Sequence, residues 1–254
     1  QNPRVQLARA LLEQPKARRK QAAFVAEGAR LVEDGVRSGL VPQFVLFKSD
    51  HAKRVDRVFE ALPPLTPCFS VENKLFDSLA DTESTQGVLA VFHQVSRQAP
   101  EDPNFVLILD QLRDPGNLGT ILRASEAAGV QAVFLPPGTV DAWSPKVVRS
   151  AMGAHFRLPI FSWEWETITA FMQGLAVFKA EMNGERSMWE TDFTLPMALL
   201  VGGEAEGVSP QGNQLATASV RIPMVGKIES LNAAISASIL MFEVLRQRTE
   251  RLNP

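Results

Sequence analysis

Short apolar runs alternate with amphipathic segments of helical length through the first part of the chain. The apolar runs lie at 24–27, 43–47, 68–71 and 87–92, and the intervening segments at 28–39, 51–62 and 72–80 have apolar residues at helical spacing. Short β-like runs separated by helical periods are typical of small mixed domains. The pattern therefore predicts an α/β unit over residues 24–93.

A second series of apolar runs begins after residue 104. The run FVLILD, at 105–110, is continuous, as in a parallel strand that is buried on both faces. Similar runs follow at 131–136, 175–180, 197–202 and 219–224, and the last segment, 231–252, is a helix with basic residues toward its end. This series predicts a second α/β domain with a mostly parallel sheet.

The two series are separated by SRQAPEDPN, residues 96–104. This stretch has two prolines, charges and small polar residues, and no apolar period, which is the composition of a linker. We therefore predict a first domain over 1–95 with a basic N-terminal extension, a linker over 96–104 and a second domain over 105–254.

The charge is uneven along the chain. The net charge is −2, yet residues 1–60 hold 12 Lys and Arg against 7 Asp and Glu. The densest basic stretch is KARRK, with Lys16, Arg18, Arg19 and Lys20. Clustered cations suit RNA phosphates, whereas a short charge run is more often a solvated helix face. Both interpretations stay open from the cluster alone.

The cysteine count, the histidine spacing and the hydropathy argue against disulfide-bonded, metal-binding and membrane-spanning proteins. Cys68 is the single cysteine, so there is no intrachain disulfide or thiolate-rich metal site. His51, His93 and His155 stand far apart, and we expect no metal. No apolar run approaches the ~20 residues that span a bilayer. We expect a cytoplasmic protein without membrane attachment. A mitochondrial-matrix location stays open because the sequence starts at Gln1 and a leader could have been removed.

Three loops that follow predicted strands carry the candidate chemistry. Open parallel sheets bind ligands beyond the carboxyl ends of their strands, and here these loops are rich in glycine and polar residues. Singly, Asn117, Ser230 and Asn232 are ordinary helix caps and Glu204 a solvated loop residue. Together, at three strand ends, they indicate a site. A dinucleotide G-x-G-x-x-G or phosphate G-K-[ST] loop is absent from the sequence.

The three loops resemble, in order, the signature motifs of the SpoU/TrmH family of RNA ribose 2′-O-methyltransferases, within the SPOUT superfamily. The motifs are NLGTILR at 117–123, LLVGGEAEGVS at 199–209 and IPMVGKIESLN at 222–232. SPKVVRSAMGAHFRLPI, at 144–160, resembles the family's link between the first two motifs. Residues 24–93 are similar, more loosely, to the L30e-like substrate-binding domain that often accompanies this catalytic domain.

The resemblance implies methyl transfer from S-adenosylmethionine to a ribose 2′-hydroxyl, most often in ribosomal RNA. In the family the residues that match Asn117 and Arg123 lie near the target ribose, and the arginine is assigned to activating its hydroxyl. A guanidinium stays protonated, so we expect Arg123 to stabilise the developing alkoxide and hold the neighbouring phosphate. Glu204, Ser230 and Asn232 match polar residues at the rim of the cofactor pocket.

Further roles follow from the same resemblance. It implies a homodimer and a C-terminal trefoil knot, which general topology rules would not suggest. The residues expected around the cofactor are Val201, Gly202, Gly207, Ile222, Met224 and Leu231. Those expected on RNA are Lys16, Arg18, Arg19, Lys20, Arg30, Lys146 and Arg149.

Other functions remain open at this point. One alternative is a catalytically silent RNA-binding module, and another is a SPOUT enzyme that methylates a base nitrogen. Within ribose chemistry, the substrate could be transfer RNA, or the methylation of ribosomal RNA could confer antibiotic resistance. The N-x-G-x-x-x-R form of the first motif favours ribose chemistry.

Overall fold

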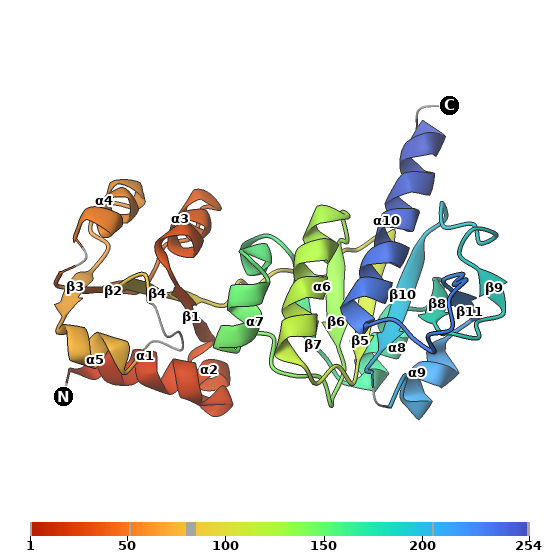
Figure 1. The fold of residues 1–254 in the computed structure, drawn as a ribbon, viewed down its shortest axis with the longest axis horizontal. Helices are drawn as coiled ribbons and strands as arrows, with labels where there is room; N and C mark the ends of the chain where they lie inside the picture. The colour runs from red at the N-terminus through yellow and green to blue at the C-terminus, as the bar shows by residue number, and fades with distance from the viewer. Residues whose placement is uncertain (1, 51, 80–84, 205, 253–254) are drawn as a thin grey trace. The chain divides into compact units, whose positions relative to one another are not determined.

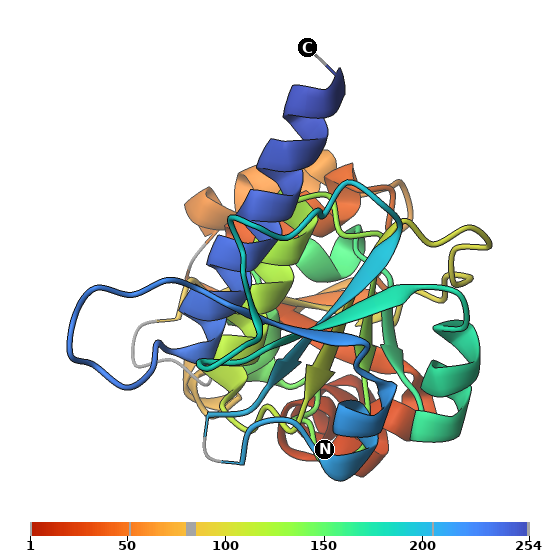
Figure 2. The same cartoon turned by 90° about the vertical axis from the view of Figure 1, so that its right-hand side faces the viewer.

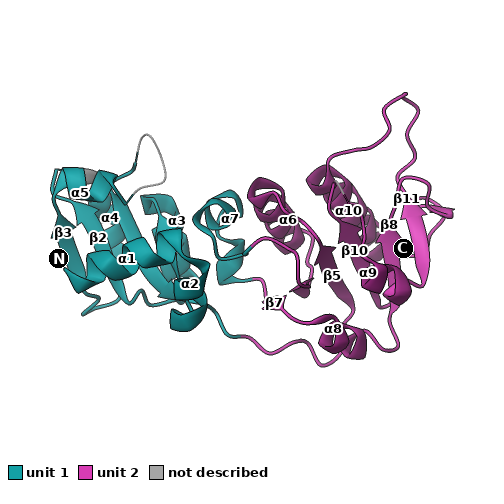
Figure 3. Ribbon diagram, turned by 90° about the horizontal axis from the view of Figure 1, so that it is seen from below, with its two compact units in different colours: residues 1–96, 141–157 teal, residues 97–140, 158–254 magenta. Residues whose placement is uncertain are grey.

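The chain folds into two compact units. The computed structural model describes residues 2–50, 52–79, 85–204 and 206–252 (Figure 1). One unit contains Gln1–Ser96 together with Asp141–Arg157, and the other contains Arg97–Val140 together with Leu158–Pro254 (Figure 3). The predicted linker segment carries no helix or strand.

The first unit has a four-stranded mixed sheet. The strand order is β1-β4-β2-β3; β4 is antiparallel to both of its neighbours, and β2 and β3 are parallel. The strands are β1 (Ala23–Glu27), β2 (Phe44–Lys48), β3 (Cys68–Val71) and β4 (Val88–His93). The helices are α1 (Pro3–Glu13), α2 (Pro15–Gln21), α3 (Ala29–Arg37), α4 (Ala52–Ala61) and α5 (Asn73–Asp77).

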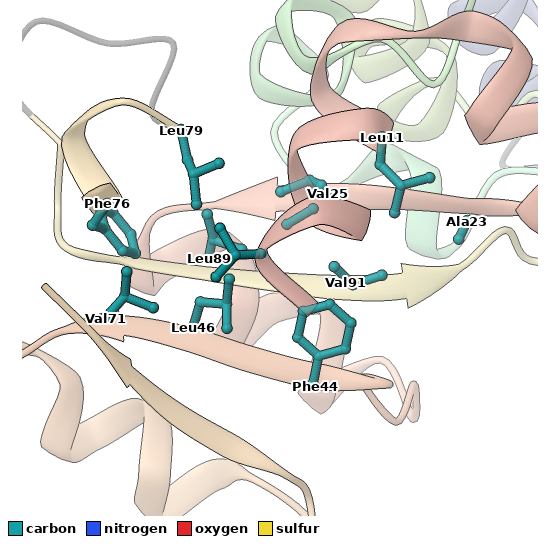
Figure 4. Packing of buried hydrophobic residues seen from close by; sticks show 12 residues of the cluster. Leu11, Ala23, Val25, Phe44, Leu46, Val71, Phe76, Leu79, Leu89 and Val91 are labelled. Carbon is teal, nitrogen blue, oxygen red and sulfur yellow. The ribbon is translucent and has the colours of Figure 1, made fainter. Parts of the chain in front are cut away.

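Alternate strand residues bury the two faces of this sheet. Val25, Leu46, Leu89 and Val91 point to the face that α1 and α5 cover, and Leu11 of α1 is fully buried there (Figure 4). The residues between them in the strands pack against α3 and α4 on the other face. Since successive strand residues face opposite sides, the continuous apolar runs of the sequence follow from burial on both faces.

A segment from the second half of the sequence completes the first unit. It contains α7 (Pro145–Ser150) and the short 3₁₀ helix η1 (Ala154–Phe156). Val148 and Phe156 are buried in the same apolar cluster as Phe24 and Phe92. Arg157 also pairs with Asp34 of α3 at 3.0 Å. Most of the segment that links the first two motifs in the sequence therefore packs on the small sheet.

The second unit has a seven-stranded sheet in which every pairing is parallel. The strand order is β7-β6-β5-β10-β8-β11-β9. The strands are β5 (Phe105–Asp110), β6 (Ala132–Leu135), β7 (Ile160–Ser162), β8 (Ala176–Ala180), β9 (Arg186–Ser187), β10 (Met197–Gly202) and β11 (Ala218–Arg221). The predicted fold class, a small α/β domain followed by a parallel α/β domain, is confirmed. The short edge strands β7 and β9 were not predicted.

Helices cover this sheet on both faces. They are α6 (Pro115–Ala127), α8 (Trp165–Phe171), α9 (Pro210–Leu215) and α10 (Ala233–Leu252). The helices α6 and α10 lie side by side (Figures 1 and 2), and the buried Ser125 hydroxyl of α6 donates to Met241 Sδ of α10 at 3.3 Å. Trp165 and Ile168 of α8 are buried with residues of β5, β6, β8 and β10. None of the described helices is both long and apolar enough to cross a bilayer.

Candidate active site

The two central strands of the parallel sheet bring the first two motifs together. Strands β5 and β10 pair in register, with Asp110 opposite Gly202, so the loops that follow them start side by side. Asp110 is fully buried, and its Oδ2 accepts a hydrogen bond from Ser209 N at 2.6 Å. A side chain at Gly203 would collide with the Gln111 carbonyl oxygen. The two loops are therefore fixed against each other by a buried carboxylate and a close backbone contact.

One side chain from each motif meets in a hydrogen-bonded cluster. Asn117 Nδ2 donates to Glu204 Oε1 at 2.8 Å, and Asn232 Nδ2 donates to the same oxygen at 2.7 Å. Asn232 Nδ2 also lies 3.1 Å from Asn117 Oδ1. The cluster satisfies Glu204 Oε1 with two amides, and hydrogen bonds to an ionised acceptor are stronger than those between neutral groups.

Helix caps fix the two asparagines. Asp114 is the N-cap of α6, and its Oδ1 accepts from Asn117 N at 2.7 Å. Asn232 Oδ1 accepts from Ala234 N at 2.9 Å and from Ile235 N at 3.2 Å, at the start of α10. The sequence-based interpretation of Asn232 as a cap is therefore correct, and the same side chain also donates to Glu204. Capping and site geometry are parts of one arrangement.

A pocket of about 690 Å³ lies beside this cluster. Its volume falls within the range of roughly 300–1,000 Å³ typical of small-molecule sites. Every residue that the resemblance placed around a cofactor lines it, as do three of the five candidate catalytic residues. These are Val201, Gly202, Gly207, Ile222, Met224 and Leu231, and Glu204, Ser230 and Asn232.

The pocket wall suits S-adenosylmethionine. Val201, Ile222 and Leu231 offer apolar surface for a flat heteroaromatic ring. Glycines at 202, 203 and 207 allow the backbone to approach closely. The carboxylates of Glu181 and Glu204 are in the wall, where they complement a ligand that carries a sulfonium and an ammonium charge. The residues present thus fit the cofactor that the motifs imply.

Arg123 lies apart from the cluster. It follows Asn117 by six residues on α6, about one and two-thirds turns, and this places the two side chains on different sides of the helix. Arg123 is exposed, and it does not line the pocket. Asn117 is within the cluster but outside the wall of the pocket. The structure thus gathers four of the five candidate catalytic residues around the pocket and leaves Arg123 on the helix surface.

The candidate RNA-binding residues all belong to the first compact unit. Helices α2 and α7 both contact β1, so the N-terminal basic cluster and the cations of α7 are in the same unit. Most of these side chains are exposed or half-buried; they are Lys16, Arg19, Lys20, Arg30, Lys146 and Arg149.

Arg18 is the exception, because the structure buries its side chain, which does not fit the expected contact with RNA. It is 3% exposed, and its Nε donates to Asp141 Oδ2 at 2.7 Å. Its Nη1 donates to the carbonyl oxygens of Leu11 at 2.6 Å and Leu12 at 3.1 Å. The guanidinium therefore joins α1 to the segment 141–157 inside the unit. A charge run in the sequence does not distinguish a solvated cation from a buried one.

Sequence reasoning missed several residues of the pocket wall. Lys179 is in β8 and Glu181 directly follows the strand. Lys179 Nζ contacts Glu181 Oε1 at 3.1 Å and Asn213 Oδ1 at 2.8 Å. The available signal was that the run at 175–180 is another parallel strand whose carboxyl end faces the same edge of the sheet. Among the described residues, no cluster of three His, Cys, Asp or Glu side chains is arranged to hold a metal ion.

Comparisons with known proteins agree with this fold and site. The model of the SpoU rRNA Methylase family matches residues 104–242, and that of the MRM3-like substrate binding domain matches residues 2–90. The human protein named rRNA methyltransferase 3, mitochondrial, is 32% identical over 91% of this chain and 69% of its own length. The Bacillus subtilis protein named 23S rRNA (guanosine(2553)-2'-O)-methyltransferase RlmP is 31% identical over 92% of each chain.

A solved structure matches nearly the whole chain. The SpoU methyltransferase AviRb from Streptomyces viridochromogenes, crystallised with AdoMet, has a TM-score of 0.87 and 27% sequence identity, and the match covers 98% of this chain and 99% of that one. The chain therefore belongs to the SpoU rRNA methylase family. It is an S-adenosylmethionine-dependent RNA methyltransferase, as the resemblance of the motifs predicted.

Proposed function

We propose that this protein transfers a methyl group from S-adenosylmethionine to the 2′-hydroxyl of a ribose in ribosomal RNA. The observation that carries the proposal is the cluster of Asn117, Glu204 and Asn232, which joins the three motifs at the edge of the pocket. The RlmP protein of Bacillus subtilis, whose printed name specifies a 23S rRNA 2′-O-methyltransferase, supports ribosomal RNA over transfer RNA.

Different residues of the chain bind the cofactor and activate the ribose. The cofactor, when bound, supplies an electrophilic methyl group. We assign its binding to the residues that line the pocket, with Val201, Ile222 and Leu231 against the apolar part of the cofactor. Glu204 and Asn232 orient the groups at the rim, and Ser230 offers a hydroxyl there. Holding two reactants in the reactive geometry accounts for a large part of such a rate enhancement.

Activation of the ribose is assigned to Arg123 and Asn117. A guanidinium is a donor and stays protonated, so its role is to stabilise the developing alkoxide and to hold a neighbouring phosphate. Asn117 Nδ2 and Oδ1 provide a donor and an acceptor beside Glu204. The proton of the 2′-hydroxyl passes to a phosphate oxygen or to water.

Because Arg123 is exposed and lies apart from the pocket, we expect it to act on the RNA bound by a second subunit, in a homodimer. On α10, which packs beside α6, three apolar side chains are exposed: Ile235 at 52%, Phe242 at 47% and Leu245 at 36%. Their spacing of seven and three residues places them on one helix face. In a dimer that buries this face, Arg123 of one subunit would serve the RNA bound by its partner. The C-terminal knot remains part of the same prediction.

The first cations that RNA meets are assigned to the first compact unit. Lys16, Arg19, Lys20, Arg30 and Lys146 are exposed, and they would neutralise backbone phosphates rather than read bases. The match of this part of the chain to a substrate-binding domain model supports that assignment. The site of methylation would then be chosen by the shape of accessible RNA.

The proposal is tested by methyl transfer from labelled S-adenosylmethionine to unmodified ribosomal RNA and, separately, to transfer RNA. We expect incorporation into ribosomal RNA and its loss in Arg123→Ala and in Asn232→Ala. A mixture of the two variants, refolded or co-expressed so that subunits exchange, should regain part of the activity if the site uses both subunits. Incorporation into transfer RNA alone would overturn the proposed substrate.

A further inference from the structure

A second, smaller pocket lies next to the cofactor pocket. It has a volume of about 190 Å³. Glu204 and Glu206 belong to the walls of both pockets, and Asn117 of the hydrogen-bonded cluster is also in the wall of the smaller one. A group bound in the smaller pocket would therefore lie beside the rim where the methyl group is transferred. Its full wall is Gln111, Leu112, Arg113, Asp114, Asn117, Glu204 and Glu206.

Arg113 and Glu206 form an ion pair in this wall. Arg113 Nη2 donates to both carboxylate oxygens of Glu206, at 2.8 and 2.9 Å. The side chains are 67% and 51% exposed. Exposed ion pairs contribute little to folding because water screens them and two long side chains must be held in place. A structural requirement thus gives no strong reason for this pair, and its partners can be exchanged readily.

The other charged groups of the two pockets already have roles. Asp114 caps α6, and Glu204 accepts from Asn117 and Asn232. Lys179, the cation in the wall of the larger pocket, contacts Glu181 and Asn213. Arg113 is thus the one cation in the wall of the smaller pocket, and among the described contacts Glu206 is held by Arg113 alone.

The chemistry of the substrate identifies what Arg113 can bind. Every ribose within an RNA strand is joined to phosphates on both sides, so a nucleotide that presents its 2′-hydroxyl at the rim also brings an anion to the smaller pocket. A guanidinium binds a phosphate through two parallel hydrogen bonds, as it binds a carboxylate. Glu206 has the charge of such an anion, and both of its carboxylate oxygens accept from Arg113 Nη2.

We propose that Arg113 binds the RNA phosphate next to the target ribose, and that Glu206 holds its guanidinium in place until this phosphate takes over. The proposal rests on the proposed function for the nature of the substrate. Glu206 acts as a competitor for Arg113 and as a negative charge that repels the incoming backbone. When no RNA phosphate reaches Arg113, the ion pair with Glu206 stays intact. The pair therefore adds selectivity for an RNA whose target nucleotide is correctly placed.

If a phosphate displaces Glu206 from Arg113, the substitutions Arg113→Ala and Glu206→Gln should change RNA affinity in opposite directions. If the ion pair only supports the loops, both should change it in the same direction. In the first case, Arg113→Ala removes a phosphate contact, and the dissociation constant for RNA rises about tenfold. The slope of log K against log salt concentration should fall by about one charge. Glu206→Gln removes the competitor, and RNA binding becomes tighter, about threefold or more. If the pair only supports the loops, both substitutions weaken binding.

The experiment uses the full chain and a labelled, unmodified transcript of 23S ribosomal RNA. Binding is measured by fluorescence anisotropy over a range of salt concentrations, with S-adenosylhomocysteine present, for the wild type, Arg113→Ala, Arg113→Lys and Glu206→Gln. Calorimetric titration of S-adenosylmethionine serves as the control for the two Arg113 variants, and we expect them to match the wild type, because Arg113 lines the smaller pocket and not the larger one. Arg113→Lys should recover part of the affinity, since it keeps the charge and loses the two-pronged geometry.

Two results would overturn the inference: unchanged binding in Arg113→Ala, or equal weakening in Arg113→Ala and Glu206→Gln. Methyl transfer by the wild type is scored in a separate assay. A wild type that transfers no methyl while the two variants shift RNA binding in opposite directions would refute the proposed function and leave the phosphate contact standing. Methyl transfer with unchanged binding in the variants would refute the contact alone.

Discussion

The side chains of Asn232 and Glu204 meet at 2.7 Å, although they come from different loops of the second compact unit. Asn232 also caps α10 through its Oδ1, so one side chain fixes a helix start and the rim of the pocket. Glu204 Oε1 accepts in addition from Asn117 Nδ2. The candidate site is therefore a junction between loops and helix starts, and its geometry depends on a single carboxylate oxygen.

Removal of the Glu204 carboxylate should break the hydrogen bonds that join the three motifs. We expect Glu204→Ala to lower the affinity for S-adenosylmethionine about tenfold or more, because two side-chain amides lose a charged acceptor. Glu204→Gln keeps an acceptor oxygen and should have a smaller effect. Isothermal titration calorimetry measures both. Equal affinities in the two variants and the wild type would contradict the role assigned to Glu204.

Two glycines, one in the second motif and one in the third, offer a matched pair of substitutions. A Cβ at Gly202 would collide with the backbone of Gly207, whereas a Cβ at Gly226 meets no heavy atom within 4 Å. We expect Gly202→Ala to reduce cofactor binding at least tenfold, because the loop must move to relieve the contact. Gly226→Ala should bind nearly as well as the wild type. The comparison fails if the two variants lose affinity to the same extent in calorimetric titration.

Arg18 provides a test of burial against RNA contact. Breaking a buried ion pair costs about 3–5 kcal/mol because the remaining charge stays unpaired, and Asp141 is partly exposed, so we expect the lower end for Arg18→Ala. Arg19 is exposed, and Arg19→Ala should leave the unfolding midpoint unchanged while it weakens RNA binding. Urea unfolding and RNA binding are measured for both. A stable Arg18→Ala protein with a reduced salt dependence of RNA binding would restore the original assignment.

His155 makes the stability of the first unit sensitive to acid. Its Nε2 donates to the Ala142 carbonyl oxygen at 2.7 Å, Nδ1 is buried without a partner, and burial lowers its pKa to about 4. The unfolded chain has the ordinary pKa near 6.5 and binds the proton more readily below that pH. Stability from this residue is therefore complete above about pH 7 and is lost as the pH falls from 6.5 toward 4.

The size of this effect follows from the two pKa values. At pH 5 the folded state should be about 2 kcal/mol less stable than at pH 8 through His155 alone. His155→Gln removes the titrating group, so its free energy of unfolding should fall less between pH 8 and pH 5 than that of the wild type. Denaturant unfolding at the two pH values gives the comparison. The same acid loss in both proteins would show that His155 does not titrate in this way.

Much of the architecture could be predicted from the sequence because its strands are short and apolar. FVLILD and the run at 197–202 lie in the centre of the parallel sheet, buried on both faces, and this gives them their continuous apolar pattern. The edge strand β9 has two residues, too few for any period. The helix α1 was not predicted either, although Asn2 and Pro3 are a good N-cap and first residue.

Long-range packing explains the rest of the differences. Val148 and Phe156 fill the core around Phe92, and no local pattern shows which sheet a helix will cover. The motifs indicated Glu204 and Asn232, but the shared oxygen between them depends on loops fixed by Asp110 far away in the sequence. Arg113 and Glu206 look like ordinary surface charges in the sequence, and only the fold places them in one pocket.

The identity of the methylated nucleoside tests the central claim most directly. Unmodified ribosomal RNA is incubated with labelled S-adenosylmethionine and the wild type, or with Asn117→Ala as the matched control, and is then digested and analysed by mass spectrometry. The account predicts one 2′-O-methylated nucleoside, resistant to alkaline cleavage at its 3′ side, and its loss in Asn117→Ala. A nucleoside methylated on its base, or an undiminished product in Asn117→Ala, would contradict it.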